Sequence, residues 1–169
     1  MVSRYFQRRA VLAGMAATAF IPSVAQAEDY IDLDWEDLLP ENETKVPNAL
    51  RGLTKHGSDP LSSQQPESSG VRADWNGKIV RLPGFIVPID LQGTGVTAFL
   101  LVPYVGACVH VPPPPANQLV FVTTETPYEN KRLFEPVNVI GMFGIASIST
   151  HAAEVGYALS ADRIEPFRQ

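Results

Sequence analysis

Hydrophobic residues in the second half of the chain gather in short runs separated by turn residues, with hardly any helical periodicity. Runs rich in apolar and β-branched residues are typical of strands. Asn76-Gly77 and Gly93-Thr94-Gly95 predict turns, and Pro83-Gly84 predicts a bulge or bend. The predicted strands are Ile79–Ile89, Val96–Val102, Leu119–Thr123, Val137–Ile148 and Gly156–Leu159, with Ala161–Ile164 closing the chain.

This pattern predicts a mainly β fold, because short strands with many turns favour a sandwich or barrel. Five principal strands, with glycines where a strand must curl, favour a small antiparallel OB-like barrel, an interpretation that by itself implies no ligand. We expect this β-barrel domain over residues 71–169, after an N-terminal docking segment and flexible linker over residues 28–70. The long linker is polar and rich in proline, glycine and serine.

A short helix is predicted at the start of the docking segment. Asp34 is placed to cap it, with Asp37 three residues later, and Pro40 ends it. Trp35, Leu38 and Leu39 would lie on one face and dock on the domain.

Residues 1–27 read as an export signal. Basic Arg4, Arg8 and Arg9 precede an apolar stretch that is too short to span a bilayer, and Ala25-Gln26-Ala27 is a cleavage pattern. The paired arginines favour a twin-arginine signal over an ordinary secretory signal. The mature protein is therefore expected to be soluble in the periplasm, with no direct membrane insertion after signal removal.

The net charge of the chain limits the classes of partner that we expect it to bind. Removing the predicted signal takes away three arginines and no acid, so the formal net charge falls from −5 to −8. An acidic surface repels phosphate backbones, so no nucleic-acid partner is expected. A cation or a basic protein face is better tolerated.

The run Gly106–Gln118 contains the residues that are candidates for metal binding or catalysis. It holds the single cysteine, Cys108, with His110 two residues later and four prolines after Val111. In extended backbone, residues two apart point to one face. Thiolate and imidazole both bind zinc or copper, and zinc is favoured here. Two ligands are too few for a tight site, and His151 is the candidate third, with Glu125 or Glu154 as alternatives.

Three other interpretations of this run stay open. Cys108 could be the nucleophile of a thiol-dependent enzyme with His110 as base and Asn117 orienting it. It could equally be a buried small hydrophobe. The rigid segment Pro112–Pro115 could form, with Trp35, the docking face of a metal-free interaction module. No phosphate-binding loop or dinucleotide fingerprint is present.

Four segments carry a family resemblance. They are Ile31–Pro40 (I-x-L-x-W-x-x-L-x-P), Val80–Pro88 (VRLPGFIVP), Phe99–Tyr104 (FLLVPY) and Gly106–Gln118 (GACVHVPPPPANQ). Together they resemble an uncharacterised family of small exported bacterial proteins, catalogued as the three-two-nine-nine domain of unknown function. The resemblance implies an accessory role in periplasmic metal handling. The sequence thus predicts a non-enzymatic periplasmic protein that binds a transition metal as an accessory to uptake or trafficking. The alternative is an interaction module that docks a transporter or another periplasmic protein.

Overall fold

The computed structural model describes residues 29–41, 64–92, 95–109 and 111–167. In these ranges the chain is mainly β, with short 3-10 helices and no α-helix. The predicted export signal lies outside the described residues. The strands are β1 (Ile31–Asp32), β2 (Lys78–Gln92), β3 (Gly95–Val102), β4 (Val120–Tyr128), β5 (Pro136–Ser149) and β6 (Glu154–Pro166), and the 3-10 helices include η1 (Trp35–Leu38) and η4 (Ala116–Gln118).

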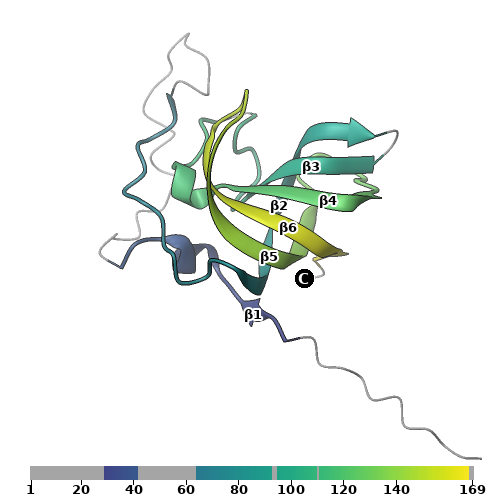
Figure 1. Ribbon diagram of the computed structural model, residues 1–169. Helices are drawn as coiled ribbons and strands as arrows, with labels where there is room; N and C mark the ends of the chain where they lie inside the picture. The colour runs from purple at the N-terminus through teal and green to yellow at the C-terminus, as the bar shows by residue number, and fades with distance from the viewer. Residues whose placement is uncertain (1–28, 42–63, 93–94, 110, 168–169) are drawn as a thin grey trace, which may run out of the picture.

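Five strands form a ring of hydrogen-bonded neighbours in the order β2-β3-β4-β6-β5, and β5 pairs back with β2 (Figure 1). β1 adds to β2 as a sixth strand. The five principal strands were predicted at these places, although Gly156–Leu159 and Ala161–Ile164 prove to be parts of one strand, β6.

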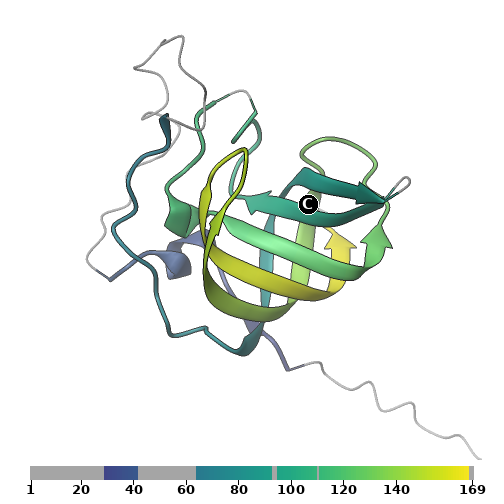
Figure 2. The same cartoon turned by 45° about the horizontal axis from the view of Figure 1, so that its top comes forward.

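The sheet is mixed, so the prediction of an antiparallel arrangement is wrong in two pairings. β1 runs parallel to β2, and β4 runs parallel to β6. Figure 2 shows β4, β6 and β5 side by side on the near wall. The antiparallel β5–β6 hairpin places β6 between β5 and β4, and β6 therefore meets β4 running in the same direction. Turn signals in a sequence predict pairing only between strands that follow one another in the chain, and β4 and β6 do not.

β2 closes the ring because its two halves pair with two different strands. Its residues 78–85 pair with β5, and residues 85–92 pair with β3. A bulge or bend was predicted at Pro83-Gly84. The pairing with β5 runs through both residues without a register shift, so there is no bulge at this point, and the irregularities lie between Pro88 and Leu91. A Cβ at Gly84 would come within 2.7 Å of Leu101 Cγ, so the glycine permits close approach of β3.

The main core fills the ring. Cross-strand rows such as Ile86–Leu101–Val120 point inward from β2, β3 and β4, following the period of two. Phe143 of β5 and Tyr157 of β6 contribute two of its large aromatic side chains, with ring centroids 5.0 Å apart. Most of the large apolar side chains of the strands are buried on this inward face.

A second apolar cluster lies on the opposite face of β2, β3 and β4. Val87, Leu100 and Phe121 form one outward row, and Phe85 pairs with Val102 beside it. We call this group the outer cluster. Leu100 and Val102 are fully buried, because other parts of the chain cover them. The covering residues are Ala107 and Cys108 after β3, Phe134 before β5, and Ala153 and Val155 at the β5–β6 hairpin.

The N-terminal segment closes one side of the ring. The predicted short helix is confirmed as η1, and the Asp34 amide donates to the Asp37 carboxylate at 2.8 Å. Leu33 and Leu38 are buried in the main core, and the indole of Trp35 donates to the Pro83 carbonyl oxygen at 2.7 Å. Among the described helices, none has the length and apolar character to cross a bilayer.

Candidate functional site

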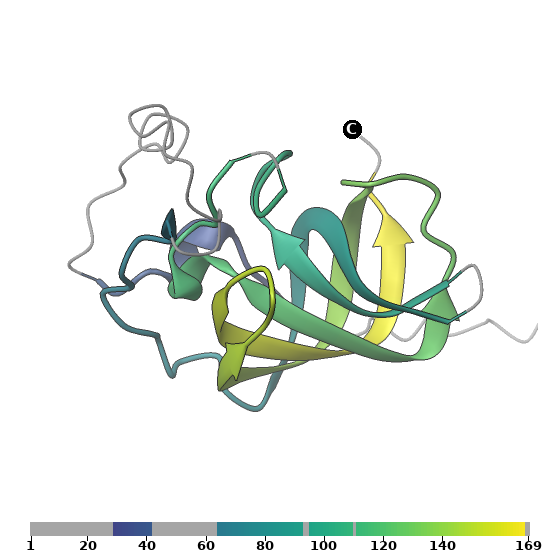
Figure 3. The same cartoon turned by 90° about the horizontal axis from the view of Figure 1, so that it is seen from above.

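The loop after β3 makes a tight turn around Gly106. The Gly106 carbonyl oxygen accepts hydrogen bonds from the amides of Val109 (3.3 Å) and Val111 (3.2 Å). Gly106 has φ 95° and Cys108 has φ 64°, a left-handed conformation that is uncommon for a residue with a side chain. Ala107 forms a bridge to Val111. Figure 3 shows this loop from above, next to the end of β3.

Cys108 is half-buried and packs against the outer cluster. Burial among apolar side chains raises the pKa of its thiol to about 12. Burial also raises the pKa of the neighbouring Tyr104 hydroxyl, and Cys108 adds to that rise. The thiol is therefore protonated at neutral pH, whereas a nucleophile or a metal ligand must be a thiolate.

The other predicted metal ligands are not gathered around this thiol in the described residues. His110 lies outside the described residues. His151 is exposed at the β5–β6 turn, and Glu125 is exposed on β4. The Glu154 carboxylate accepts a hydrogen bond from Ser149. Across the part of the chain that the structure describes, no three His, Cys, Asp or Glu side chains are placed to hold one metal ion.

The proline segment is largely inside the protein. Pro113, Pro114 and Pro115 are buried, and only Pro112 is partly accessible. The Pro114 carbonyl oxygen accepts a hydrogen bond from the Gln65 side chain at 2.9 Å. These rings therefore pack against the protein itself, and the predicted docking face of four prolines has little free surface.

The two amides that follow the prolines hold the N-terminal part of the chain. Asn117 Nδ2 donates to the Gly70 carbonyl oxygen at 2.9 Å, and Gln118 Nε2 donates to the Trp35 carbonyl oxygen at 2.9 Å. Both side chains are buried. Asn117 thus has a structural task in place of the orienting role considered for it in a thiol enzyme.

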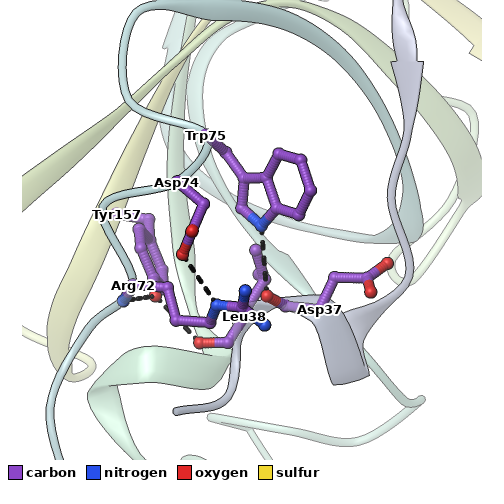
Figure 4. A network of polar contacts seen from close by, with 6 residues as sticks. All are labelled: Asp37, Leu38, Arg72, Asp74, Trp75 and Tyr157. Carbon is purple, nitrogen blue, oxygen red and sulfur yellow. Dashed lines mark hydrogen bonds and ion pairs between the residues drawn. The ribbon is translucent and has the colours of Figure 1, made fainter. Parts of the chain in front are cut away.

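A tyrosine of β6 completes this attachment (Figure 4). The buried Tyr157 hydroxyl donates to the Leu38 carbonyl oxygen at 2.8 Å and accepts from the Arg72 amide at 2.7 Å. The Trp75 indole donates to the Asp37 carbonyl oxygen at 3.1 Å, and the Arg72 guanidinium bonds to Asp74. Sequence reasoning missed the contacts of Tyr157 as well as those of Asn117 and Gln118, although two polar residues so soon after the rigid prolines are a signal for buried amides.

Gln65 makes a similar attachment near the β5–β6 hairpin. Its amide nitrogen donates to the Glu154 carbonyl oxygen at 2.8 Å, and its amide oxygen accepts from the Glu154 backbone amide at 2.8 Å. The side chain thereby satisfies both backbone groups of one residue. Most of the strongest sequence motif and its partners therefore maintain the fold, whereas the turn around Cys108 packs on the outer cluster and also leaves Val105 and Val109 exposed.

These observations define a small, mainly β protein with a single half-buried thiol. Loops of the same chain cover the outward face of its sheet. A family model described as "Protein of unknown function (DUF3299)" matches residues 35–166, and the chain belongs to this family. The resemblance seen in the sequence is thus confirmed.

One solved structure supports the same assignment. It is the crystal structure of a DUF3299 family protein (PA4066) from Pseudomonas aeruginosa PAO1, with 32% sequence identity and a TM-score of 0.70. The match covers 83% of this chain and 98% of that chain. Among curated proteins, no match was found.

Proposed function

We propose that this protein is a non-enzymatic interaction module of the periplasm, which docks a transporter subunit or another periplasmic protein. The observation that carries the proposal is the tight turn around Cys108, which places apolar side chains in solvent. Val105 is 61% exposed and Val109 is 36% exposed, although both flank the buried Ala107. Exposed apolar residues on a constrained loop suit a protein interface.

The negative net charge of the chain indicates which partner surface would complement it. The chain without its predicted signal carries a formal net charge of −8, because the signal contains three arginines and no acid. A partner face that combines apolar residues with lysine or arginine complements such a surface. The proposed contact surface is Val105 and Val109, and it replaces the proline segment in that role.

For the architecture we propose an OB-like barrel. The closed order of five strands and the sharing of β2 between two neighbours support this description. On such folds the outward face of consecutive central strands is a common binding surface. Here that face carries the outer cluster, beside the proposed contact surface.

Site-specific photo-crosslinking tests the docking proposal. A benzophenone side chain at Val105 should give one discrete protein adduct in the native periplasm, and Val109→Asp should abolish it. The same group at the exposed Thr126 of β4 is the matched control and should give none. Absence of an adduct at Val105, or the same adducts from both positions, would contradict the proposal.

A transition-metal site is the second candidate, and the left-handed backbone of Cys108 favours it. Strained conformations of residues with side chains are often kept at functional positions. Cys108 and His110 would be ligands, with His151 as the third and zinc as the preferred ion. The raised pKa of the thiol opposes this role, since metal binding must first displace its proton.

Elemental mass spectrometry separates the two candidates. Near-stoichiometric zinc or copper in the exported protein, lost in Cys108→Ser, would establish the metal site. Metal-free protein together with the Val105 adduct would leave docking as the function. A thiol-dependent enzyme has the least support, because the apolar surroundings of Cys108 keep the thiol protonated.

A further inference from the structure

Two of the loops that cover the outer cluster, beside the β5–β6 hairpin, are attached in different ways. The loop before β5 brings Phe134, and it is fixed to β2 by two backbone hydrogen bonds. The Phe134 amide donates to the Ile86 carbonyl oxygen, and the Ile86 amide donates to the Glu135 carbonyl oxygen, both at 3.1 Å. The Glu135 carboxylate also accepts from Tyr128 and from the Lys131 amide. This loop is a fixed wall of the cluster.

The segment after β3, Tyr104–Val109, is attached by side-chain packing. Its described backbone hydrogen bonds end on Gly106, within the loop itself. Tyr104 packs against the cluster at the start of the segment, and the small side chains of Ala107 and Cys108 hold its tip near the fully buried Leu100 and Val102. We call this segment the cover.

Both ends of the cover are anchored. β3 ends at Val102, where it pairs with Phe85, and the buried Pro113–Pro115 stretch leads into the amides that hold the N-terminal segment. The flexible glycine Gly106 lies between these anchors, at φ 95°. The main core contains no residue of the cover, so the cover can move without disturbing the ring.

We propose that Tyr104–Val109 is a movable cover, which opens locally over the outward face of β2, β3 and β4 while the ring stays folded. Opening exposes Leu100 and Val102 and changes the presentation of Val105 and Val109. The opening motion does not depend on what the protein binds. Its role in regulating docking rests on the proposed function.

Cys108 provides a built-in reporter of opening. In the closed state its thiol is half-buried, and an open cover presents it to solvent. Ellman's reagent should label the full-length protein at a rate that is nearly independent of low urea concentrations, because local opening exposes little surface. A thiol in the main core, made as Cys108→Ser with Val122→Cys, is the matched control. It should be labelled at least about 100-fold more slowly, with the urea dependence of global unfolding.

Three results would overturn the proposal. Labelling of Cys108 with the same urea dependence as the core thiol means that the cover opens only when the domain unfolds. Labelling as fast as a free thiol means that the cover is not closed at all. A core thiol labelled as readily as Cys108 means that the motion is not local. No partner is present in this experiment, so its failure is distinct from failure of the docking proposal.

Discussion

The side-chain amide of Gln118 donates a hydrogen bond to the carbonyl oxygen of Trp35, 83 residues earlier in the chain. The bond is 2.9 Å long and joins the end of the proline-containing motif to the 3-10 helix η1. It explains why polar residues follow the prolines, since a buried backbone carbonyl needs a donor.

Replacing Gln118 by methionine should test this attachment. Gln118→Met keeps most of the side-chain volume but leaves the Trp35 carbonyl oxygen without this donor. We expect a loss of about 1–3 kcal/mol in the free energy of unfolding, measured by urea denaturation. Thr126→Ala, on the exposed part of β4, should differ from the wild type by no more than about 0.5 kcal/mol. Equal midpoints for Gln118→Met and the wild type would show that the bond contributes nothing.

Tyr157→Phe should weaken the hold on the N-terminal segment and leave the main core packed. The variant removes the hydroxyl that links the Leu38 carbonyl oxygen and the Arg72 amide, whereas the ring beside Phe143 is retained. We expect about 1–3 kcal/mol of destabilisation. Limited proteolysis should then release residues 28–41 before the ring is cut. Simultaneous cleavage of both parts would contradict this order.

Stability should fall in alkaline solution. Burial raises the pKa of Cys108 to about 12, and burial together with Glu135 raises the pKa of Tyr128 to about 12. As the pH rises above the ordinary values of these groups, the unfolded chain loses protons that the folded chain keeps. The free energy of unfolding therefore decreases between about pH 9 and about pH 12.

The contribution of the thiol can be isolated with Cys108→Ser. Urea denaturation at a series of pH values should give a shallower decrease for the variant, because serine does not ionise in this range. Absorbance at the thiolate band should show that the folded wild type keeps its proton above pH 9. Parallel curves for the two proteins would mean that Cys108 titrates normally in the fold.

Two glycines of β5 should differ in their tolerance of alanine. A Cβ at Gly141 would collide with the Ser160 carbonyl oxygen and come within 2.8 Å of Ala161 Cα. A Cβ at Gly144 has as its nearest neighbour the Asn76 side-chain oxygen, at 3.4 Å. Gly141→Ala should cost about 1–3 kcal/mol or prevent folding, and Gly144→Ala should be much milder. Thermal unfolding of both variants measures the difference, and equal midpoints would contradict it.

The local features of the fold could be predicted from the sequence, because each depends on neighbouring residues. Runs rich in apolar and β-branched residues predicted β2 to β6, and Asp34 with Asp37 predicted η1. The residue patterns also carried the family resemblance that the family model confirms. The joining of two predicted strands into β6 shows the limit of such patterns, since an exposed Ser160 interrupts the apolar run without ending the strand.

The site was predicted less well, because its character depends on what covers each side chain. The sequence left both a functional and a buried interpretation of Cys108 open, and the structure shows that Pro113–Pro115 are buried and that the thiol packs among apolar residues. No local pattern distinguishes a proline that faces solvent from one that packs beneath a distant segment. The metal and docking hypotheses stay predictions that the experiments above test, and the localisation stays a prediction.

The sequence by itself determined where strands and turns form, the single cysteine, the acidic charge and the family. The tertiary structure decided the closure of the ring, the parallel pairing of β4 with β6, the outer cluster and the tasks of Gln118 and Tyr157. The physical reason is the range of the interactions. Periodicity and turn chemistry act over a few residues, whereas the Tyr157 hydroxyl meets a carbonyl oxygen 119 residues away, a contact that only the folded chain creates.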